Sequence, residues 1–120
     1  MDLKYHTKLE IDMCHRMMAH FDSLGVTFEW QLEVLTGIID FHLPATNQII
    51  ECKDNNEIHK MMSALGQLLF YHVSIPGSHL FVASEPMPDP KAMSVFKKHG
   101  VKAWPMGWDV VTKYEGVLGW

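Results

Sequence analysis

Residues 37–53 read GIIDFHLPATNQIIECK, and this stretch decides the fold. Two apolar runs stand on either side of residues 44–47, Pro-Ala-Thr-Asn, which have the composition of a turn between strands. We therefore expect a hairpin. Because side chains alternate across a strand, the apolar residues at odd-numbered positions of the first run should share one face, opposite Asp40 and its neighbours Ile38 and His42. These apolar residues are Ile39, Phe41 and Leu43.

Three ionisable side chains interrupt the apolar pattern of this hairpin. Asp40 lies in the first predicted strand, and Glu51 and Lys53 share one face of the second. A single carboxylate is costly to bury inside an apolar strand, but two carboxylates beside a divalent cation and an ammonium group offset one another. The hairpin therefore predicts a site at which Asp40, Glu51 and Lys53 converge.

The order of Asp40 and then Glu51-x-Lys53 resembles the signature of the PD-(D/E)XK nuclease superfamily. Three segments carry a closer resemblance to its RecB-like branch, with similarity to Holliday-junction resolvase-type nucleases. They are GIIDF at 37–41, similar to G-x-[IV]-D, IIECK at 49–53, similar to an apolar strand ending in E-x-K, and QLLFY at 67–71, which matches the Q-x-x-x-Y helix motif. The resemblance covers roughly residues 9–104.

The resemblance implies an α/β fold with a restriction-endonuclease-like core, in which helices flank a mixed central sheet in the order α-β-β-β-α-β-α-β. The residue pattern along the chain predicts the same order. The predicted elements outside the hairpin are a helix over 7–24, strands over 26–35, 79–84 and 101–104, a helix beginning near Asp54, and a helix over 91–99. A chain of 120 residues has the size of one domain, so we expect residues 1–120 to form a single nuclease-like domain.

On such a fold the resemblance implies hydrolysis of DNA phosphodiester bonds with Mg²⁺ or Mn²⁺. The implied metal ligands are the carboxylates of Asp40 and Glu51, the backbone carbonyl of Cys52 and the carboxylate of Glu10. Hard divalent cations prefer such oxygen ligands. Lys53 would orient or help deprotonate the attacking water and neutralise developing charge. Endonuclease and exonuclease action, and single-stranded, duplex or branched substrates, are all compatible with the sequence.

The carboxylate of Glu10 allows two interpretations. The first predicted helix stops at Gly25, and Glu10 lies on its apolar face. The other residues of this face are Cys14, Met17, Phe21 and Leu24. As a first-turn carboxylate it could point to water and favour the helix dipole. The resemblance instead implies that Glu10 reaches over the hairpin and completes the metal site. Glu33, on the polar side of the strand predicted over 26–35, is the reserve candidate for that role.

Gln67 and Tyr71 lie one turn apart on the helix whose start is predicted from the capping-box spacing of Asp54 and Glu57. This helix has an apolar stripe that we expect to be buried, formed by Ile58, Met61, Met62, Leu65, Leu68, Leu69 and His72. Gln67 and Tyr71 then stand at the edge of the core, as ordinary boundary residues often do. The resemblance implies more: Gln67 hydrogen-bonds near Lys53 or a DNA phosphate, and Tyr71 orients the same cluster.

A cluster of basic residues lies near the end of the helix predicted over 91–99. The cluster consists of Lys97, Lys98, His99 and Lys102. Its lysines either stabilise the helix C-terminus or, together with Gln67, contact DNA. The net charge of −4 and the single arginine, Arg16, count against a free-standing general DNA binder, since Lys and Arg contacts to phosphate supply most nonspecific affinity. A bound metal, oligomerisation or a partner would then have to supply positive potential.

Composition also predicts a compartment and an assembly state. Cys14 and Cys52 lack zinc-like spacing, which indicates buried thiols of a reducing compartment. No signal peptide is visible, and no apolar run approaches the roughly 20 residues of a membrane span. We expect a cytoplasmic protein of prokaryotic or phage origin that binds DNA, forms a homodimer or homotetramer and has no membrane partner. The aromatic segment 105–120 could stack on bases, pack against a second subunit or cover the sheet.

Two other functions are compatible with these residues. The chain could be a non-catalytic nucleic-acid-binding or assembly module on the same fold, although such a module has no use for the carboxylates of Asp40 and Glu51. It could also be a small α/β protein whose D…E-x-K order is accidental, a surface hairpin with salt-bridged charges that are individually replaceable with small effects. The metal-dependent nuclease is the function that the sequence favours.

Overall fold

The computed structural model describes residues 7–105 of the chain. Its elements are α1 (Lys8–Ser23), β1 (Glu29–Val34), β2 (Gly37–Leu43), β3 (Gln48–Lys53), α2 (Ile58–Ser74), β4 (His79–Ser84), α3 (Pro90–Lys98) and β5 (Val101–Ala103). The predicted order α-β-β-β-α-β-α-β is confirmed. Apart from Pro105, the C-terminal aromatic segment falls on residues 106–120, so the alternatives raised for it lie outside the described residues.

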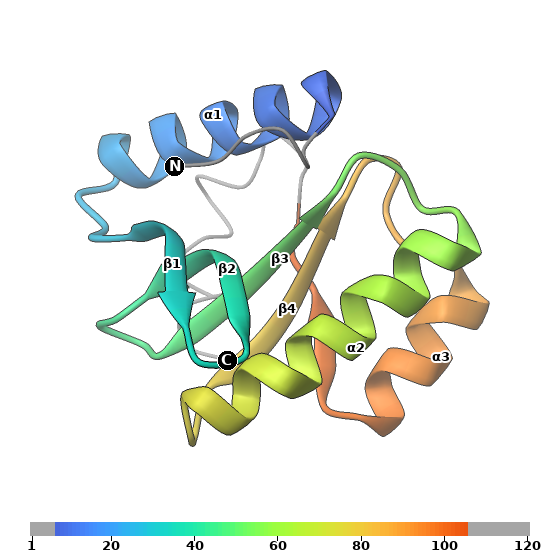
Figure 1. Ribbon diagram of the computed structural model, residues 1–120. Helices are drawn as coiled ribbons and strands as arrows, with labels where there is room; N and C mark the ends of the chain where they lie inside the picture. The colour runs from blue at the N-terminus through green and yellow to red at the C-terminus, as the bar shows by residue number, and fades with distance from the viewer. Residues whose placement is uncertain (1–6, 106–120) are drawn as a thin grey trace.

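Five strands form one mixed sheet in the order β1-β2-β3-β4-β5 (Figure 1). The pairs β1–β2 and β2–β3 are antiparallel, whereas β3, β4 and β5 run parallel. The turn at residues 44–47 joins β2 to β3, which confirms the predicted hairpin. Parallel neighbours need a crossover connection, and α2 and α3 each supply one.

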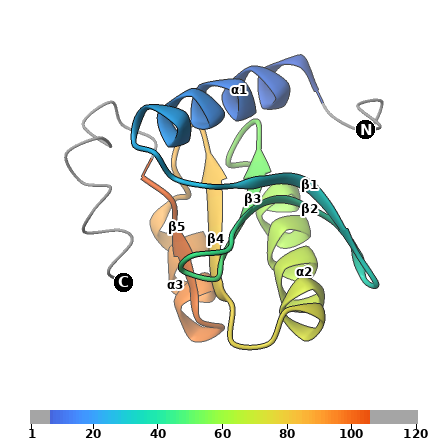
Figure 2. The same ribbon diagram turned by 90° about the vertical axis from the view of Figure 1, so that its left-hand side faces the viewer.

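Helices cover both faces of the sheet, with α1 on one face and α2 and α3 on the other (Figure 1 and Figure 2). Each face has its own apolar core. The core under α1 consists of Met13, Cys14, Met17, Phe21, Phe41, Leu43, Ile50, Cys52, Phe81, Ala83 and Trp104. The core under α2 and α3 consists of Ile39, Ile49, Met61, Ala64, Leu68, Tyr71, Leu80, Val82, Ala92, Phe96 and Val101. β4 contributes alternate residues to both cores, as its nearly continuous apolar run predicts for a central strand.

The face predicted for Ile39 is wrong. The alternation rule places Ile39 with Phe41 and Leu43, but Ile39 packs in the core under α2 while the other two pack under α1. The register of β2 with β3 covers residues 41–43, so residues 37–40 of β2 have left β3. A strand that loses one neighbour is free to twist there and turn its side chains to the other face of the sheet. Strict alternation holds for a strand that stays paired on both sides.

β1 changes faces at the same point as β2, because the register between these two strands is continuous. Trp30, opposite Phe41, packs on the α1 side, and Leu32, opposite Ile39, packs on the α2 side. Between them Gln31 has a φ of 54°, a left-handed conformation that is uncommon outside glycine. The β1–β2 pair therefore twists as a unit and curves away from the rest of the sheet (Figure 2).

α1 begins and ends close to its predicted bounds. The Thr7 hydroxyl accepts a hydrogen bond of 3.1 Å from the backbone N–H of Glu10, which caps the helix. Gly25, with a φ of 68°, follows the last turn in the left-handed conformation that ends many helices. Only 7% of Glu10 is exposed, so its interpretation as a carboxylate that points to water is wrong. Both cysteines are free thiols buried in the core under α1, as predicted.

α2 differs from its prediction at its start and in its buried face. Glu57 precedes its first residue and makes no side-chain capping bond, and Asp54 lies 3.5 Å from Lys60 instead, so the predicted capping box is wrong. The residues that α2 buries are Met61, Ala64, Leu68 and Tyr71. The predicted stripe is wrong for the exposed residues Ile58, Met62, Leu69 and His72. Apolar side chains occur around much of this helix, so its sequence alone does not single out the covered face.

β1 begins three residues after the start predicted for it at residue 26, and the remaining elements agree with their predictions within a residue or two. The Asp89 side chain accepts a hydrogen bond of 2.9 Å from the backbone N–H of Ala92 and caps α3, which ends just before Gly100. Within residues 7–105, no helix has the length and apolar character needed to cross a membrane.

Candidate functional site

A pocket of about 620 Å³ opens where β2 leaves β3, between α1 and α2. Its lining brings together the six side chains that the sequence singles out as catalytic or metal-binding. They are Glu10, Asp40, Glu51, Lys53, Gln67 and Tyr71. These residues come from α1, β2, β3 and α2, which are distant in the chain and meet at this edge of the fold.

The side chain of Asp40 takes the place of a missing strand contact. Its Oδ2 atom accepts a hydrogen bond of 2.8 Å from the backbone N–H of Cys52. The register of β2 with β3 ends at Phe41, so this N–H has no partner in the backbone of β2. A buried N–H needs an acceptor, and the Asp40 carboxylate provides it. This bond holds Asp40 against the strand that carries Glu51.

Glu51 is a carboxylate with only 3% of its surface exposed. Burial, and after it the Asp40 carboxylate, raise the pKa of Glu51 well above its ordinary value, while the Lys53 ammonium lowers it. Its Oε2 atom lies 3.4 Å from Lys53 Nζ. Its Oε1 atom is buried and has no hydrogen-bond partner. Such an oxygen is costly unless a ligand satisfies it.

The ammonium group of Lys53 is held between β3 and α2. Its Nζ donates to Gln67 Oε1 at 2.7 Å and to Ser63 Oγ at 3.4 Å, in addition to its ion pair with Glu51. An ammonium has three protons to donate, and these three acceptors match that number. Gln67 therefore lies directly against the lysine, the first of the two places that the resemblance implies for it.

Tyr71 ties α2 to the strand that carries Asp40. Its hydroxyl donates to the backbone carbonyl of Ile38 at 2.7 Å. Gly37 has a φ of 145°, and a Cβ added there would lie 3.1 Å from Tyr71 Cε1, so glycine suits this position on both counts. Burial, followed by the charges of Glu51 and Asp40, raises the pKa of Tyr71 far above its usual range, so the hydroxyl keeps its proton and donates. The glycine of G-x-[IV]-D and the tyrosine of Q-x-x-x-Y thus form one contact.

Glu10, and not Glu33, belongs to this pocket. Glu33 is exposed on β1 and does not line the pocket, so the reserve position predicted for it is wrong. Glu10 lines the pocket, and its charge adds to burial and to Asp40 in raising the pKa of Glu51. Three carboxylates therefore face one cavity.

Sequence reasoning missed several residues of the pocket. Thr7, Thr36, Lys60, Gly66 and Phe70 line it, and Ser63 reaches it through Lys53. On α2, Lys60 and Ser63 lie seven and four residues before Gln67 and Phe70 lies three after it, while Gly66 is one turn before Phe70, which places them on the same side of the helix. This spacing was visible in the sequence, but without the tertiary structure nothing distinguished that side from the others.

The chain has the fold of a nuclease. Residues covering 82% of it superpose on 46% of a chain described as a repair endonuclease from Pyrococcus abyssi, with a TM-score of 0.58 and 12% sequence identity. This chain spans about half the length of that endonuclease. No protein-family model and no curated protein matches the sequence. The predicted fold class, a mixed sheet flanked by helices in a restriction-endonuclease-like core, is confirmed, and membership of the RecB-like branch stays a prediction.

The pocket presents carboxylate oxygens, the type of ligand that a hard divalent cation prefers. Among residues 7–105, no three His, Cys, Asp or Glu side chains are grouped closely enough to form a complete metal site. Mg²⁺ commonly binds through one or two carboxylates and keeps several waters. The adjacent carboxylates of Asp40 and Glu51, with the unpartnered Oε1 of Glu51, provide such a donor set.

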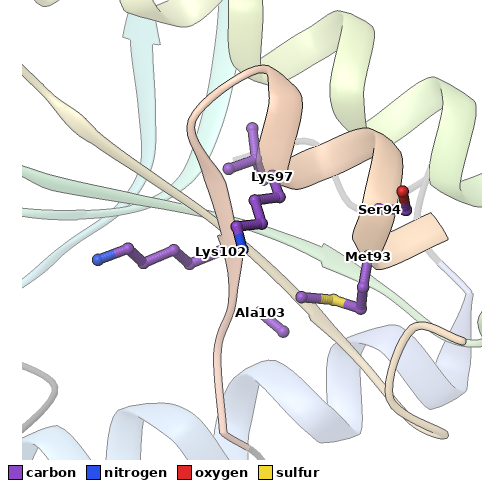
Figure 3. Close-up of a pocket in the computed structure, with 6 residues that line it drawn as sticks. Met93, Ser94, Lys97, Lys102 and Ala103 are labelled. Carbon is purple, nitrogen blue, oxygen red and sulfur yellow. The ribbon is translucent and has the colours of Figure 1, made fainter. Parts of the chain in front are cut away.

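The basic cluster does not join this site. Lys97 and Lys102 line a different pocket of about 660 Å³ between α3 and β5, and Figure 3 shows their side chains extending in different directions. α3 leads into the first residue of β5, at the amino ends of the parallel strands, whereas Lys53 is the last residue of β3. Contact of DNA with Lys97, Lys98 and Lys102 stays a prediction.

Proposed function

We propose that the chain is a metal-dependent deoxyribonuclease, which hydrolyses DNA phosphodiester bonds with Mg²⁺ or Mn²⁺. The observation that carries this proposal is Glu51, a buried carboxylate beside Asp40 with one oxygen left without a partner. Two adjacent buried carboxylates destabilise a fold, and a bound cation offsets that cost. The shared fold with a repair endonuclease supports the same class of reaction.

Asp40 and Glu51 would hold the ion, with the Cys52 carbonyl and Glu10 as further oxygen ligands. A bound divalent ion supplies charge stabilisation at the phosphate and lowers the pKa of a bound water. The hydrogen bond from Cys52 N–H to Asp40 supports this assignment, because it places the backbone of Cys52 beside the carboxylate of Asp40.

Lys53 is the residue best placed to act on the water and the phosphate. Its ammonium lies 3.4 Å from Glu51, so it reaches the place where the scissile phosphate would sit. It would orient the attacking water and neutralise charge on the phosphate oxygens. Gln67 positions Lys53 through the bond of 2.7 Å, and Tyr71 positions Asp40 through the Ile38 carbonyl.

The test is cleavage of labelled single-stranded, duplex and branched DNA with Mg²⁺ or Mn²⁺. The parent is compared with Glu51→Gln and Lys53→Ala, and Glu33→Gln is the matched control because Glu33 is an exposed carboxylate outside the pocket. We expect metal-dependent cutting by the parent and the control, and a loss of about 10²-fold or more in the two pocket variants.

Two results would contradict the proposal. Cutting that survives in Glu51→Gln would assign the activity to a contaminant or to another site. A folded parent that binds DNA and cuts none of the three substrates would favour the non-catalytic module on the same fold. Circular dichroism of each variant shows whether a loss of cutting follows from unfolding.

A further inference from the structure

The pocket has an apolar rim that the proposed chemistry does not use. Phe70 lines the pocket although 65% of its surface is exposed, and Ile38, 43% exposed, lines it as well. Exposing a large aromatic ring to water is unfavourable, whereas a phosphate or a metal ion gains nothing from an apolar neighbour. An exposed aromatic ring at the mouth of a charged pocket therefore indicates a flat, apolar part of a ligand.

Gly66 supplies a second, independent observation at the same rim. It lies within α2 and lines the pocket, and a Cβ added to it would meet no atom within 4 Å. A glycine inside a helix is destabilising relative to alanine, and nothing within the described residues requires it here. A helical side chain leans toward the preceding turn, so Phe70 lies over the turn that holds Gly66. The missing side chain leaves room beside the ring for something to approach.

The rim is held in place before any ligand binds. Thr36 Oγ1 donates to the backbone carbonyl of Phe70 at 3.0 Å and lies 2.8 Å from Ser74 Oγ. These bonds fasten the β1–β2 turn to α2 on the side of the helix next to Phe70. A ring on a packed helix with such support loses little conformational freedom when it binds.

Among residues 7–105, only two lysines line the pocket. The lysines that line it are Lys53, already bonded to Glu51 and Gln67, and Lys60, which lies 3.5 Å from Asp54. Arg16 forms a two-pronged ion pair with Glu85. Phosphate contacts alone would therefore be weak, and base stacking on an aromatic ring is the other main source of affinity for nucleic acid strands.

We propose that Phe70, with the space beside Gly66, is a stacking subsite for an unpaired base next to the scissile phosphate. The inference rests on the proposed nuclease function and deepens it by naming the substrate class, DNA whose bases are unpaired at the site of cutting. Inside a duplex both faces of a base are already stacked on its neighbours, so away from the duplex ends an unpaired base is needed to offer a face to Phe70. Stacking tolerates every base, so this subsite selects strand structure and leaves sequence unread.

The test measures binding separately from cutting. Every protein carries Glu51→Gln, which blocks the proposed cleavage and removes one negative charge from the pocket. Phe70→Ala and Phe70→Trp are compared with Val95→Ala, because Val95 lies on α3, is 47% exposed and does not line the pocket. The probes are a single strand that contains the fluorescent base 2-aminopurine and the duplex made from it.

We expect the Glu51→Gln protein that retains Phe70 to bind the single strand more tightly than the duplex. Binding should also quench the 2-aminopurine fluorescence of the single strand. Phe70→Ala should bind the single strand about 5-fold to 100-fold more weakly and lose the quenching. Phe70→Trp should retain both properties, and Val95→Ala should match the protein that retains Phe70. Equal binding by Phe70→Ala, or tighter binding of the duplex, would overturn the stacking subsite.

Cleavage by the parent distinguishes the two proposals. Suppose that the parent cuts DNA, and that Phe70→Ala without the Glu51 substitution cuts single strands and duplexes at the parental rates. That result would support the nuclease function and contradict the stacking subsite. If the parent cuts no DNA but Phe70-dependent quenching is observed, the result would support a stacking subsite in a binding module. It would contradict the proposed hydrolysis.

Discussion

The backbone N–H of Cys52 and the carboxylate of Asp40 form a hydrogen bond of 2.8 Å at the point where β2 separates from β3. The carboxylate replaces the strand partner that the N–H would otherwise have in a continuous ladder. One bond thus has two consequences, since it satisfies a buried donor and places Asp40 beside Glu51. The separation of β2 from β3 opens the pocket and places the Asp40 carboxylate in it.

Replacing Asp40 separates these two consequences. Asp40→Asn keeps an oxygen that accepts from Cys52 and removes the repulsion with Glu51, so we expect its stability to be at least that of the parent while metal-dependent cleavage is lost. Asp40→Ala leaves the buried N–H without an acceptor and should lower the free energy of unfolding by about 1–3 kcal/mol. Urea denaturation in a chelator, together with the cleavage assay, checks both. Equal stability of the two variants would show that the Asp40–Cys52 bond contributes nothing.

Glu51 should make the stability of the metal-free protein depend on pH. Burial raises its pKa in the folded state, so over a pH window that starts near the ordinary value of 4.5 the folded chain binds a proton that the unfolded chain has released. Stability contributed by the protonated form is therefore present below this window and is lost as pH rises through the raised pKa. We expect Glu51→Gln to lack this slope and to be more stable than the parent at neutral pH.

Denaturation midpoints of the parent and Glu51→Gln, measured in chelator from about pH 5 to about pH 8, test this expectation. Added Mg²⁺ should raise the midpoint of the parent at neutral pH and leave that of Glu51→Gln nearly unchanged, because a ligand stabilises only the state that binds it. A parent midpoint that ignores both pH and Mg²⁺ would count against a buried ionisable metal ligand.

The same substitution should have opposite effects at two glycines. Gly37→Ala places a Cβ 3.1 Å from the Tyr71 ring at a φ of 145°, and we expect it to lower the free energy of unfolding by about 1–3 kcal/mol. Gly66→Ala lies in open space within α2 and should raise it by about 0.5–1 kcal/mol. Urea denaturation compares the two variants with the parent. A destabilised Gly66→Ala would indicate that this glycine serves the fold.

Removing the acceptor for Lys53 should impair catalysis more than stability. Gln67→Leu deletes the bond of 2.7 Å to Lys53 and leaves the ammonium with Ser63 and Glu51, so its position should loosen. We expect the rate of cleavage to fall by about 10-fold to 100-fold. Ser63→Ala removes a longer bond, 3.4 Å, and should cost less. Single-turnover cleavage at saturating protein measures both variants. An unchanged rate in Gln67→Leu would show that Gln67 does not position Lys53 for catalysis.

The exposed side of α2 supports the predicted homo-oligomer. Its residues Ile58, Met62, Leu69 and Val73 are exposed and follow one another along a single stripe, with the half-buried Leu65 between them. Steps of four and three residues are typical of a helix that packs along another helix, and a twofold axis would pair this stripe with the same stripe of a second copy. We propose that α2 forms such a dimer contact.

Mass measurement in solution tests this contact. Met62→Glu and Val73→Glu should convert a dimer to a monomer, whereas Leu35→Glu, a change at a turn residue that is 99% exposed, should leave the mass unchanged. A monomeric parent at high protein concentration, with and without DNA, would contradict the proposal.

Local patterns predicted more of the site than of the packing. The alternation of β3 placed Glu51 and Lys53 on one face, and helical spacing placed Gln67 and Tyr71 one turn apart, because both relations depend only on the geometry of one element. The buried face of α2 was predicted wrongly, since Met62 and Ala64 are both acceptable in a core and the sheet decides which is covered. Phe70 could not be assigned to the site from the sequence, because only the tertiary structure shows that it lines the pocket.

The order of the elements, the hairpin and the ionisable residues that each strand carries can all be predicted from the sequence, because these follow from short-range propensities and periodicity. The tertiary structure decided that Ile39 and Phe41 face opposite cores, that Cys52 donates to Asp40, and that Glu10 rather than Glu33 joins the pocket. The physical reason is that these relations depend on where β2 parts from β3 and on how α1 crosses the sheet. Both are set by contacts between segments far apart in the chain, which no local pattern contains.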